Sequence, residues 1–148
     1  MKLLIQRVQN AQIRIEDQLH SSIGRGLLVF LGFHKNDAVS QIGECVKKLV
    51  HLRIFSDEQN KMNLSVKDVS GEILLVSQFT LYANCKNGRR PDYMDAAPPL
   101  TAIPLYEEFI VKLKQEAVPV KTGKFGANMQ VSLINDGPVT IIIDTLSI

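Results

Sequence analysis

The segment GLLVFLGFH, Gly26–His34, is apolar along nearly its whole length and is bounded by Gly24 and by the polar residues KND. A strand with one face in water alternates apolar and polar residues, and this segment does not alternate. The pattern therefore predicts a strand buried on both faces, which requires layers of structure above and below its sheet.

Further strands are expected on both sides of this one. The N-terminal residues are rich in Leu, Ile and Val with polar residues between them, which favours two early strands that pair with each other. Similar apolar runs predict a second buried strand and three strands near the C-terminus. The predicted ranges are 2–8, 12–16, 72–79, 118–120, 129–134 and 139–144.

Two segments have the spacing of amphipathic helices. Between Asp37 and Val50, apolar residues recur every three or four positions, and Asn36 or Asp37 is placed to cap the first turn. The segment 101–117 repeats this spacing, with Pro104 tolerated in its first turn. Because strands and helices do not alternate regularly, we expect an α+β fold with the two helices on one side of two layered sheets.

Composition limits the class of protein. A chain of 148 residues is long enough for one core and too short for two ordinary domains, so residues 1–148 are expected to form a single domain. The 45% hydrophobic and 22% charged residues are typical of a soluble globular protein, and the apolar runs are far shorter than the roughly 20 residues that span a bilayer. Gln6 and Arg7 interrupt any signal-peptide core, and the isolated Cys45 and Cys85 are typical of free thiols, so a cytoplasmic location is expected.

No metal or cofactor is predicted. The sequence has no His or Cys pair at metal-ligand spacing, and its aspartates show no carboxylate cluster. The GRG segment at Gly24–Gly26 lacks the spacing of phosphate-binding loops. A net charge of +2 does not by itself indicate nucleic acid, so that argument depends on local clusters of charge.

Three motifs carry the chemical signal: SQFTLYA at Ser77–Ala83, KNGRRPD at Lys86–Asp92, and TGKFGANMQVSLINDGPVT at Thr122–Thr140. Each has an ordinary structural interpretation. SQFTL is typical of a strand end whose polar side chains bond their own backbone, and KNGRRPD of a solvated loop. NDGPVT would form a hairpin turn between two strands, because proline lacks the N–H that a central strand needs.

Together and in this order, the motifs resemble those of the D-aminoacyl-tRNA deacylases. The resemblance runs from LIQRV at Leu4–Val8 through GRGLLVFLG, LRIF, KMNLSV and AAPP to near the C-terminus. It implies a three-layer β/β/α domain with barrel-like sheets that works as a homodimer. It also implies hydrolysis of the ester bond of D-aminoacyl-tRNA at its acceptor end, and of glycine mischarged on the tRNA for alanine.

The resemblance gives Gly137 and Pro138 a specific role. In the family this pair is joined by a cis peptide bond and reaches into the partner subunit's active site, where its carbonyl oxygens face the chiral centre. A rigid backbone wall of this kind selects by excluding the side chain of an L-aminoacyl ester. A relative that tolerates L-alanyl esters holds the pair trans and departs at the SQFTL motif, where this chain does not depart.

Two mechanisms remain open for the motif at Ser77–Thr80. Thr80 is the nucleophile candidate, but no base accompanies it, because His20, His34 and His51 lie outside the motifs. In the preferred alternative, the 2′-hydroxyl of the substrate's terminal ribose assists attack by water. The backbone N–H groups of Phe79 and Thr80 then polarise the ester carbonyl, and Gln78 orients substrate or water.

The remaining candidate residues surround this centre. The resemblance places Ser77 and Met129 against the substrate, while the ring of Phe79 forms either a wall or part of the core. Lys86, Arg89, Arg90 and the more distant Lys124 are candidates for phosphates of the acceptor stem. A non-catalytic RNA-binding module is the alternative function, although the sequence shows no aromatic stacking platform.

Overall fold

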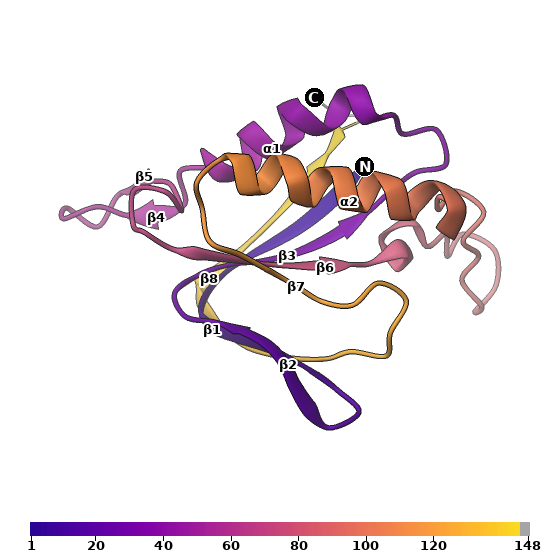
Figure 1. Ribbon diagram of the computed structural model, residues 1–148, viewed down its shortest axis with the longest axis horizontal. Coiled ribbons are helices and arrows are strands. Elements are labelled where there is room, and N and C mark those ends of the chain that lie inside the picture. Colours follow the sequence, from indigo (N-terminus) through magenta and orange to yellow (C-terminus); the bar gives the residue numbers. More distant parts are fainter. Residues whose placement is uncertain (146–148) are drawn as a thin grey trace.

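The computed structural model describes residues 1–145 and consists of two helices packed against a strongly bent sheet (Figure 1). In chain order the elements are β1 (Lys2–Ile15), β2 (Gln18–Ile23), β3 (Gly26–Gly32), the 3-10 helix η1 (Val39–Gln41), α1 (Ile42–Val50), β4 (Phe55–Ser56), β5 (Met62–Leu64), β6 (Glu72–Ser77), the 3-10 helix η2 (Phe79–Tyr82), α2 (Pro99–Gln115), β7 (Val120–Thr122) and β8 (Gln130–Asp144).

Strand β1 is the centre of the sheet because it pairs with three other strands. Its first half is antiparallel to β3, from Lys2 opposite Gly32 to Val8 opposite Gly26. Its second half is antiparallel to β2, and β8 follows both halves along the other edge. Beyond β3, strands β6 and β7 add in parallel.

The prediction of two paired early strands, 2–8 and 12–16, was wrong. These residues form the single strand β1, and its antiparallel neighbour is β2, which sequence analysis missed because QLHSSI is mostly polar. The chain reverses at Glu16 and Asp17, whose φ angles of 50° and 61° are those of a tight hairpin turn with left-handed residues.

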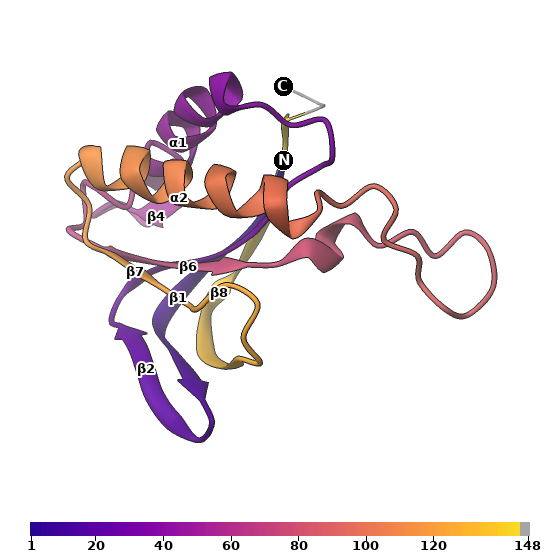
Figure 2. The ribbon, with the colours of Figure 1, turned by 45° about the vertical axis from the view of Figure 1, so that its right-hand side comes forward.

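Two separate clusters of buried residues divide the molecule into three layers. Along β3, Leu27, Val29 and Leu31 pack with the helices, whereas Leu28 faces the opposite way. Leu28 belongs to a second cluster with Val8, Ala11 and Ile13, in which the two arms of the bent sheet face each other. The buried strand predicted at 26–34 is confirmed, although it ends two residues earlier, at Gly32, and the α+β class with both helices on one side is confirmed as well (Figures 1 and 2).

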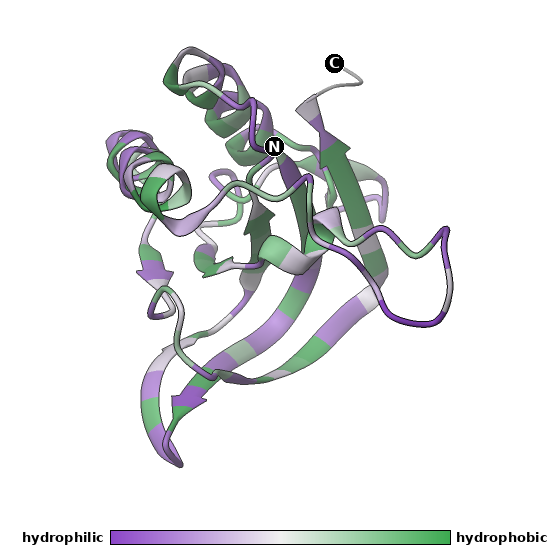
Figure 3. Ribbon diagram, turned by 90° about the vertical axis from the view of Figure 1, so that its right-hand side faces the viewer, coloured by the Kyte–Doolittle hydropathy of each residue, from purple (hydrophilic) through white to green (hydrophobic). Residues whose placement is uncertain are grey.

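The hydropathy of the residues differs between the part of the sheet beneath the helices and the lower arm (Figure 3). Hydrophobic residues concentrate where the sheet lies beneath the helices, and hydropathy alternates along the lower arm that β1, β2 and β8 form. Alternation is expected where a strand buries one face only. Within residues 1–145, no helix combines the length and apolar character needed to cross a membrane.

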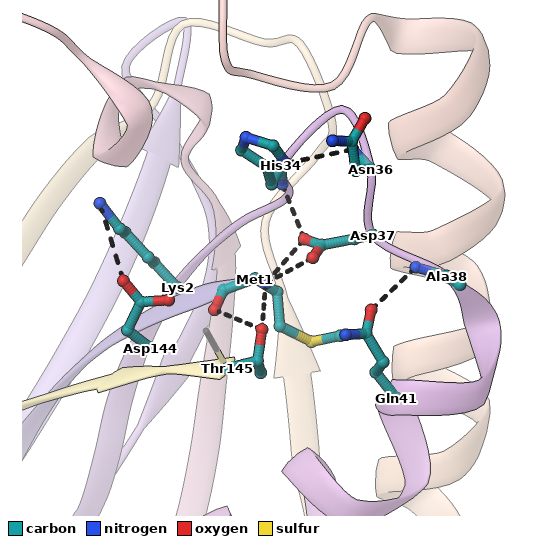
Figure 4. Close-up of polar contacts among 9 residues, drawn as sticks. All are labelled: Met1, Lys2, His34, Asn36, Asp37, Ala38, Gln41, Asp144 and Thr145. Atoms are coloured by element: carbon teal, nitrogen blue, oxygen red, sulfur yellow. Dashed lines mark hydrogen bonds and ion pairs between the residues drawn. The ribbon is translucent and has the colours of Figure 1, made fainter. Parts of the chain in front are cut away.

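Both helices differ from their predicted starts. Helix α1 begins at Ile42 after η1, so neither Asn36 nor Asp37 caps it. The buried carboxylate of Asp37 instead accepts hydrogen bonds from the Met1 ammonium and from the backbone N–H of His34 (Figure 4). Helix α2 begins at Pro99, which places Pro104 inside the helix and not in its first turn.

Contacts around Met1 tie three parts of the chain together (Figure 4). The Met1 ammonium lies 2.7 Å from the Asp37 carboxylate and also donates to the Thr145 hydroxyl, just beyond β8. Lys2 and Asp144 add a partly exposed pair at 4.0 Å. The start of β1, the loop before α1 and the end of β8 are thereby held at one edge of the sheet.

Gly26, at the start of β3, allows a close approach that a methyl group would block. A Cβ atom there would lie 1.9 Å from the Glu72 carbonyl oxygen of β6, so Gly26→Ala forces the two strands apart. We expect a loss of at least about 2 kcal/mol in the free energy of unfolding, measured by denaturant titration. Gly43→Ala in α1 is the matched control, because its Cβ would meet nothing within 4 Å. It should raise stability by about 0.5–1 kcal/mol, and equal effects of the two substitutions would contradict this packing.

Candidate active site

A pocket of about 470 Å³ opens where β3 and β6 end beside the start of α2. Parallel strands bring their carboxyl ends to the same sheet edge, a common position for binding sites in such sheets. The lining is mainly apolar and comes from four parts of the chain. It consists of Leu31, Gly32, Phe33, Val76, Ser77, Gln78, Phe79, Ala97, Pro99, Ala102, Phe125, Gly126, Ala127, Met129 and Val131.

Gly32 explains how the two strand ends meet so closely. A Cβ atom at this position would lie 2.7 Å from the carbonyl oxygen of Gln78. The backbone N–H of Gln78 donates to the carbonyl of Leu31 at 2.8 Å, which extends the strand pairing by one bond. The backbone of Gln78 is therefore fixed against β3 at the wall of the pocket.

The predicted strand 72–79 ends earlier than expected, at Ser77. The next residues, Phe79–Tyr82, form η2. Ser77, Gln78 and Phe79 line the pocket, whereas Thr80 does not. The side-chain amide of Gln78 donates a hydrogen bond to the Thr80 hydroxyl. In this arrangement the hydroxyl of Thr80 holds Gln78 in place.

Tyr82, the last residue of η2, anchors this short helix in the protein interior. Its ring is buried, with the His34 ring 5.4 Å away and the Lys2 ammonium 4.8 Å from its centroid. Burial, with smaller contributions from Asp37 and Asp144, raises the pKa of the Tyr82 phenol. The phenol therefore stays neutral and acts as a packed support for the turn.

Among the residues that the structure describes, neither a histidine nor a cysteine lines the pocket. The His34 ring packs against Tyr82 at an interplanar angle of 56°, His51 directly follows α1, and His20 lies exposed on β2. Burial raises the pKa of the Cys45 thiol to about 11, and Cys85 lies exposed in a loop. Within residues 1–145, no group of three or more His, Cys, Asp or Glu side chains could hold a metal ion. Among residues 1–145, the pocket lining therefore contains no histidine, cysteine, lysine or carboxylate side chain that could act as a base.

Met129 lines the pocket from the segment before β8. Its thioether passes over Gly123, where an added Cβ atom would lie 2.5 Å from the sulfur. A flexible, polarisable side chain in this position adapts to ligands of different shape.

Gly137 and Pro138 do not line this pocket and do not form a hairpin turn. The strands predicted at 129–134 and 139–144 are one strand, β8, with a bulge at Asp136–Val139. Pairing with β1 stops at Asn135 opposite Val8 and resumes at Thr140 opposite Gln6, so the bulge projects from the ladder opposite Arg7. Gly137 and Pro138 are both exposed at its tip.

The buried side chain of Arg7 binds the bulge through Asp136. Only 9% exposed, its guanidinium lies 3.1 Å from the Asp136 carboxylate and donates to the carbonyl oxygens of Asp136 and Ile54. The side-chain amide of Asn135 donates to the carbonyls of Arg7 and Val139, at 2.9 and 3.1 Å, and bridges the base of the bulge. The Asp136 carboxylate is 33% exposed, so solvent weakens this ion pair, and the hydrogen bonds from Arg7 to two backbone carbonyls add to it in holding the bulge.

The expected cis bond between Gly137 and Pro138 was wrong for this structure, because every peptide bond of residues 1–145 is trans. The change of direction at the bulge comes from Gly137 instead. Its φ of +113° is accessible to glycine and not to L-residues, and it returns the chain to the ladder at Thr140. An added Cβ there would also lie 2.4 Å from an Arg7 guanidinium nitrogen.

The three cations of the KNGRRPD motif lie on a loop that extends away from the body beside η2 (Figure 2). Two backbone hydrogen bonds between Asn84 and Asp92, at 2.9 and 3.0 Å, close the base of this loop. Lys86, Arg89 and Arg90 are exposed, and within residues 1–145 they form no ion pair with a carboxylate. Lys124 lies apart from them, in a second hollow with Glu16 and Asp17.

Sequence analysis missed two contributions to this region. The pocket residues Ala97, Pro99 and Ala102 lie in and after AAPP, a motif that was noted without a role. Arg7 was considered only as an interruption of a signal peptide, because nothing local in LIQRV indicates burial against residue 136.

Comparisons with known proteins agree over nearly the whole chain. The family described as D-Tyr-tRNA(Tyr) deacylase matches residues 4–144. The D-aminoacyl-tRNA deacylase of Protochlamydia amoebophila is 62% identical over 146 residues, which are 99% of this chain and 97% of that protein. The protein of the same name from Finegoldia magna is 57% identical, over 99% of each chain.

Solved structures share the fold. One named c-Myc DNA Unwinding Element Binding Protein is 41% identical, with a TM-score of 0.93 over 98% of this chain and 99% of that one. A probable eukaryotic D-amino acid tRNA deacylase, 18% identical, has a TM-score of 0.83 over 96% and 97% of the two chains and shows the fold alone. From the sequence match and the high identity to its relatives, the chain belongs to the D-aminoacyl-tRNA deacylase family.

Proposed function

We propose that this protein hydrolyses the ester bond of D-aminoacyl-tRNA and releases the D-amino acid and free tRNA. The observation that carries the proposal is the pocket at the ends of β3 and β6, lined by Ser77, Gln78 and Phe79, in a chain of this family. Its volume of about 470 Å³ falls within the roughly 300–1,000 Å³ of small-molecule sites, enough for an aminoacyl group with part of the terminal adenosine.

The mechanism relies on positioning and not on a protein nucleophile. The first N–H groups of a short helix have no partner within it. We assign the role of donor to the ester carbonyl to the N–H of Phe79, which lines the pocket, and to that of Thr80, which follows it in η2 although Thr80 lies outside the lining. Such donors stabilise the oxyanion that forms when water attacks. The vicinal 2′-hydroxyl of the substrate's ribose assists that water, because no side-chain base lines the pocket.

Selection of the D-enantiomer is assigned to the bulge of a second copy. Gly137 and Pro138 are exposed and rigidly held, yet they are absent from the pocket of their own protomer. Ile134 and Ile142, on the same strand, are 51% and 67% exposed, an apolar surface that favours association of two copies. In such a homodimer the bulge would enter the partner's pocket as a backbone wall. Glycine, which has no side chain to exclude, would be accepted, including glycine mischarged on the tRNA for alanine.

A second candidate function is deacylation with relaxed chirality. The trans bond between Gly137 and Pro138 is the observation that favours it, because the family's exclusion of L-esters was attributed to a cis bond. The intact SQFTL motif favours the first candidate. A cytoplasmic location completes the proposal, since charged tRNA is used there.

Matched D- and L-tyrosyl-tRNA test the proposed reaction directly. We expect release of D-tyrosine to exceed that of L-tyrosine by roughly 100-fold or more in kcat/KM, a difference of about 2.7 kcal/mol in the barrier. Comparable rates for both would support relaxed chirality. Hydrolysis of neither, by protein that is folded and binds tRNA, would support the non-catalytic RNA-binding module.

Thr80→Ala distinguishes the two mechanisms. If Thr80 only donates its N–H and holds Gln78, activity should stay within about tenfold of wild type, or about 1.4 kcal/mol, while a substrate with a terminal 2′-deoxyribose should lose far more. Thr80→Ser is the control that keeps the hydroxyl. An inactive, folded Thr80→Ala together with a trappable acyl-enzyme would establish Thr80 as the nucleophile instead.

Mixing two inactive variants tests the shared site. Gly137→Val forces a side chain against Arg7, and Gln78→Ala removes the amide from the pocket. A heterodimer of these chains has one pocket with both parts intact, so random mixing should recover about a quarter of wild-type activity. If purified, folded heterodimers recover nothing, each pocket is complete within one chain.

A further inference from the structure

An exposed aromatic pair lies at the edge of the pocket. The rings of Phe79 and Tyr93 are 5.2 Å apart between centroids and meet edge to face at 66°. Phe79 is 57% exposed and Tyr93 40% exposed, although rings of this size are usually buried. Sequence analysis predicted no such platform, because the two residues are separated by the whole basic loop.

The fold holds both rings in place. Phe79 begins η2 and lines the pocket, so it forms the inner end of the pair. Tyr93 follows the Asn84–Asp92 bridge and begins a turn in which the N–H of Ala96 donates to its carbonyl at 3.0 Å. The ammonium of Lys35 braces the same turn through the carbonyl of Met94 and the carboxylate of Asp95. Tyr93 thus lies on a braced segment in contact with Phe79, just outside the pocket lining.

Three cations lie near this pair, as do the carboxylates of Asp92 and of Asp95, the latter paired with Lys35. Lys86, Arg89 and Arg90 lie on the loop whose base leads directly to Tyr93, and they are exposed without a carboxylate partner among residues 1–145. Aromatic rings beside unpaired cations are the combination by which proteins bind single-stranded nucleic acid, since bases stack and phosphates pair. An apolar protein partner would not require these cations.

We propose that Phe79 and Tyr93 form a stacking platform for the unpaired nucleotides that precede the terminal adenosine of the tRNA, while the basic loop contacts their phosphates. This rests on the proposed function, because the pocket is taken to hold the aminoacyl end. A strand that leaves the pocket past Phe79 meets the ring of Tyr93 next and then the cations. The platform would therefore act on substrate binding and not on the ester itself.

Two substrates of different length test the platform. D-Tyrosyl-tRNA reaches it, whereas the D-tyrosyl ester of adenosine ends inside the pocket. Tyr93→Ala should raise KM for the tRNA about tenfold with little change in kcat, since stacking of one base is worth roughly 5- to 150-fold in affinity. Its effect on kcat/KM for the short ester should stay below twofold. Tyr93→Phe should restore the tRNA KM, and Val111→Ala, on the exposed side of α2, is the unrelated apolar control.

Equal losses on both substrates would mean that Tyr93 merely supports Phe79, and no loss on either would exclude a platform. A changed oligomeric state of Tyr93→Ala in light scattering would identify the pair as a contact between copies instead.

Binding of uncharged tRNA gives a readout that does not depend on the reaction. Tyr93→Ala should weaken binding of intact tRNA and not of tRNA lacking its last three nucleotides, even if the wild type proves inactive on D-esters. An equal effect on both tRNAs would overturn the platform.

Discussion

The pairing of β1 with three strands is the constraint on which the other features depend. One edge of β1 is shared between β3 and β2, so its two halves belong to different arms of the bent sheet. The helices cover one arm and the second cluster fills the space between the arms. Strand β8 pairs with β1 on both sides of this bend. The extra residues of β8 therefore have to leave the ladder near the bend. The bulge at Asp136–Val139 lies there, with Arg7 beneath it.

Features of the fold that depend on short stretches of chain were predictable. The run at 26–32 has no polar position to place in water, and α1 buries Ile42, Val46 and Leu49 as its spacing indicates. Features that depend on residues distant in the chain could not be predicted from the sequence. The polar β2 is a strand because β1 offers it an edge, and β8 continues through Gly-Pro because pairing with β1 resumes on the other side. Local turn signals at residues 135–138 could not show that.

In the candidate site, too, some features follow from short motifs and others depend on residues distant in the chain. Its motifs predict that Ser77, Gln78, Phe79, Thr80, Met129, Gly137 and Pro138 belong to one site. Ser77, Gln78, Phe79 and Met129 line the pocket, whereas Thr80, Gly137 and Pro138 do not. The tertiary contacts around them had no local signal. Thr80 holds the Gln78 amide, Arg7 reaches a residue 129 positions away, and Tyr93 meets Phe79 across a loop. The motifs therefore predict which residues gather at the strand ends, while the contacts that support them depend on the fold.

The long separation between β1 and β8 has a consequence for folding on the ribosome. Residues 2–15 emerge long before their partners at 130–144, so one edge of the central strand stays unpaired until those partners have been made. Contacts between distant residues form slowly because a large loop must close, and an open apolar edge invites pairing with other chains meanwhile. The Asp136–Val139 bulge forms only when that closure occurs. Protein that has not completed its central sheet would therefore lack the feature assigned to chiral selection, and completion of the fold and completion of the site would coincide.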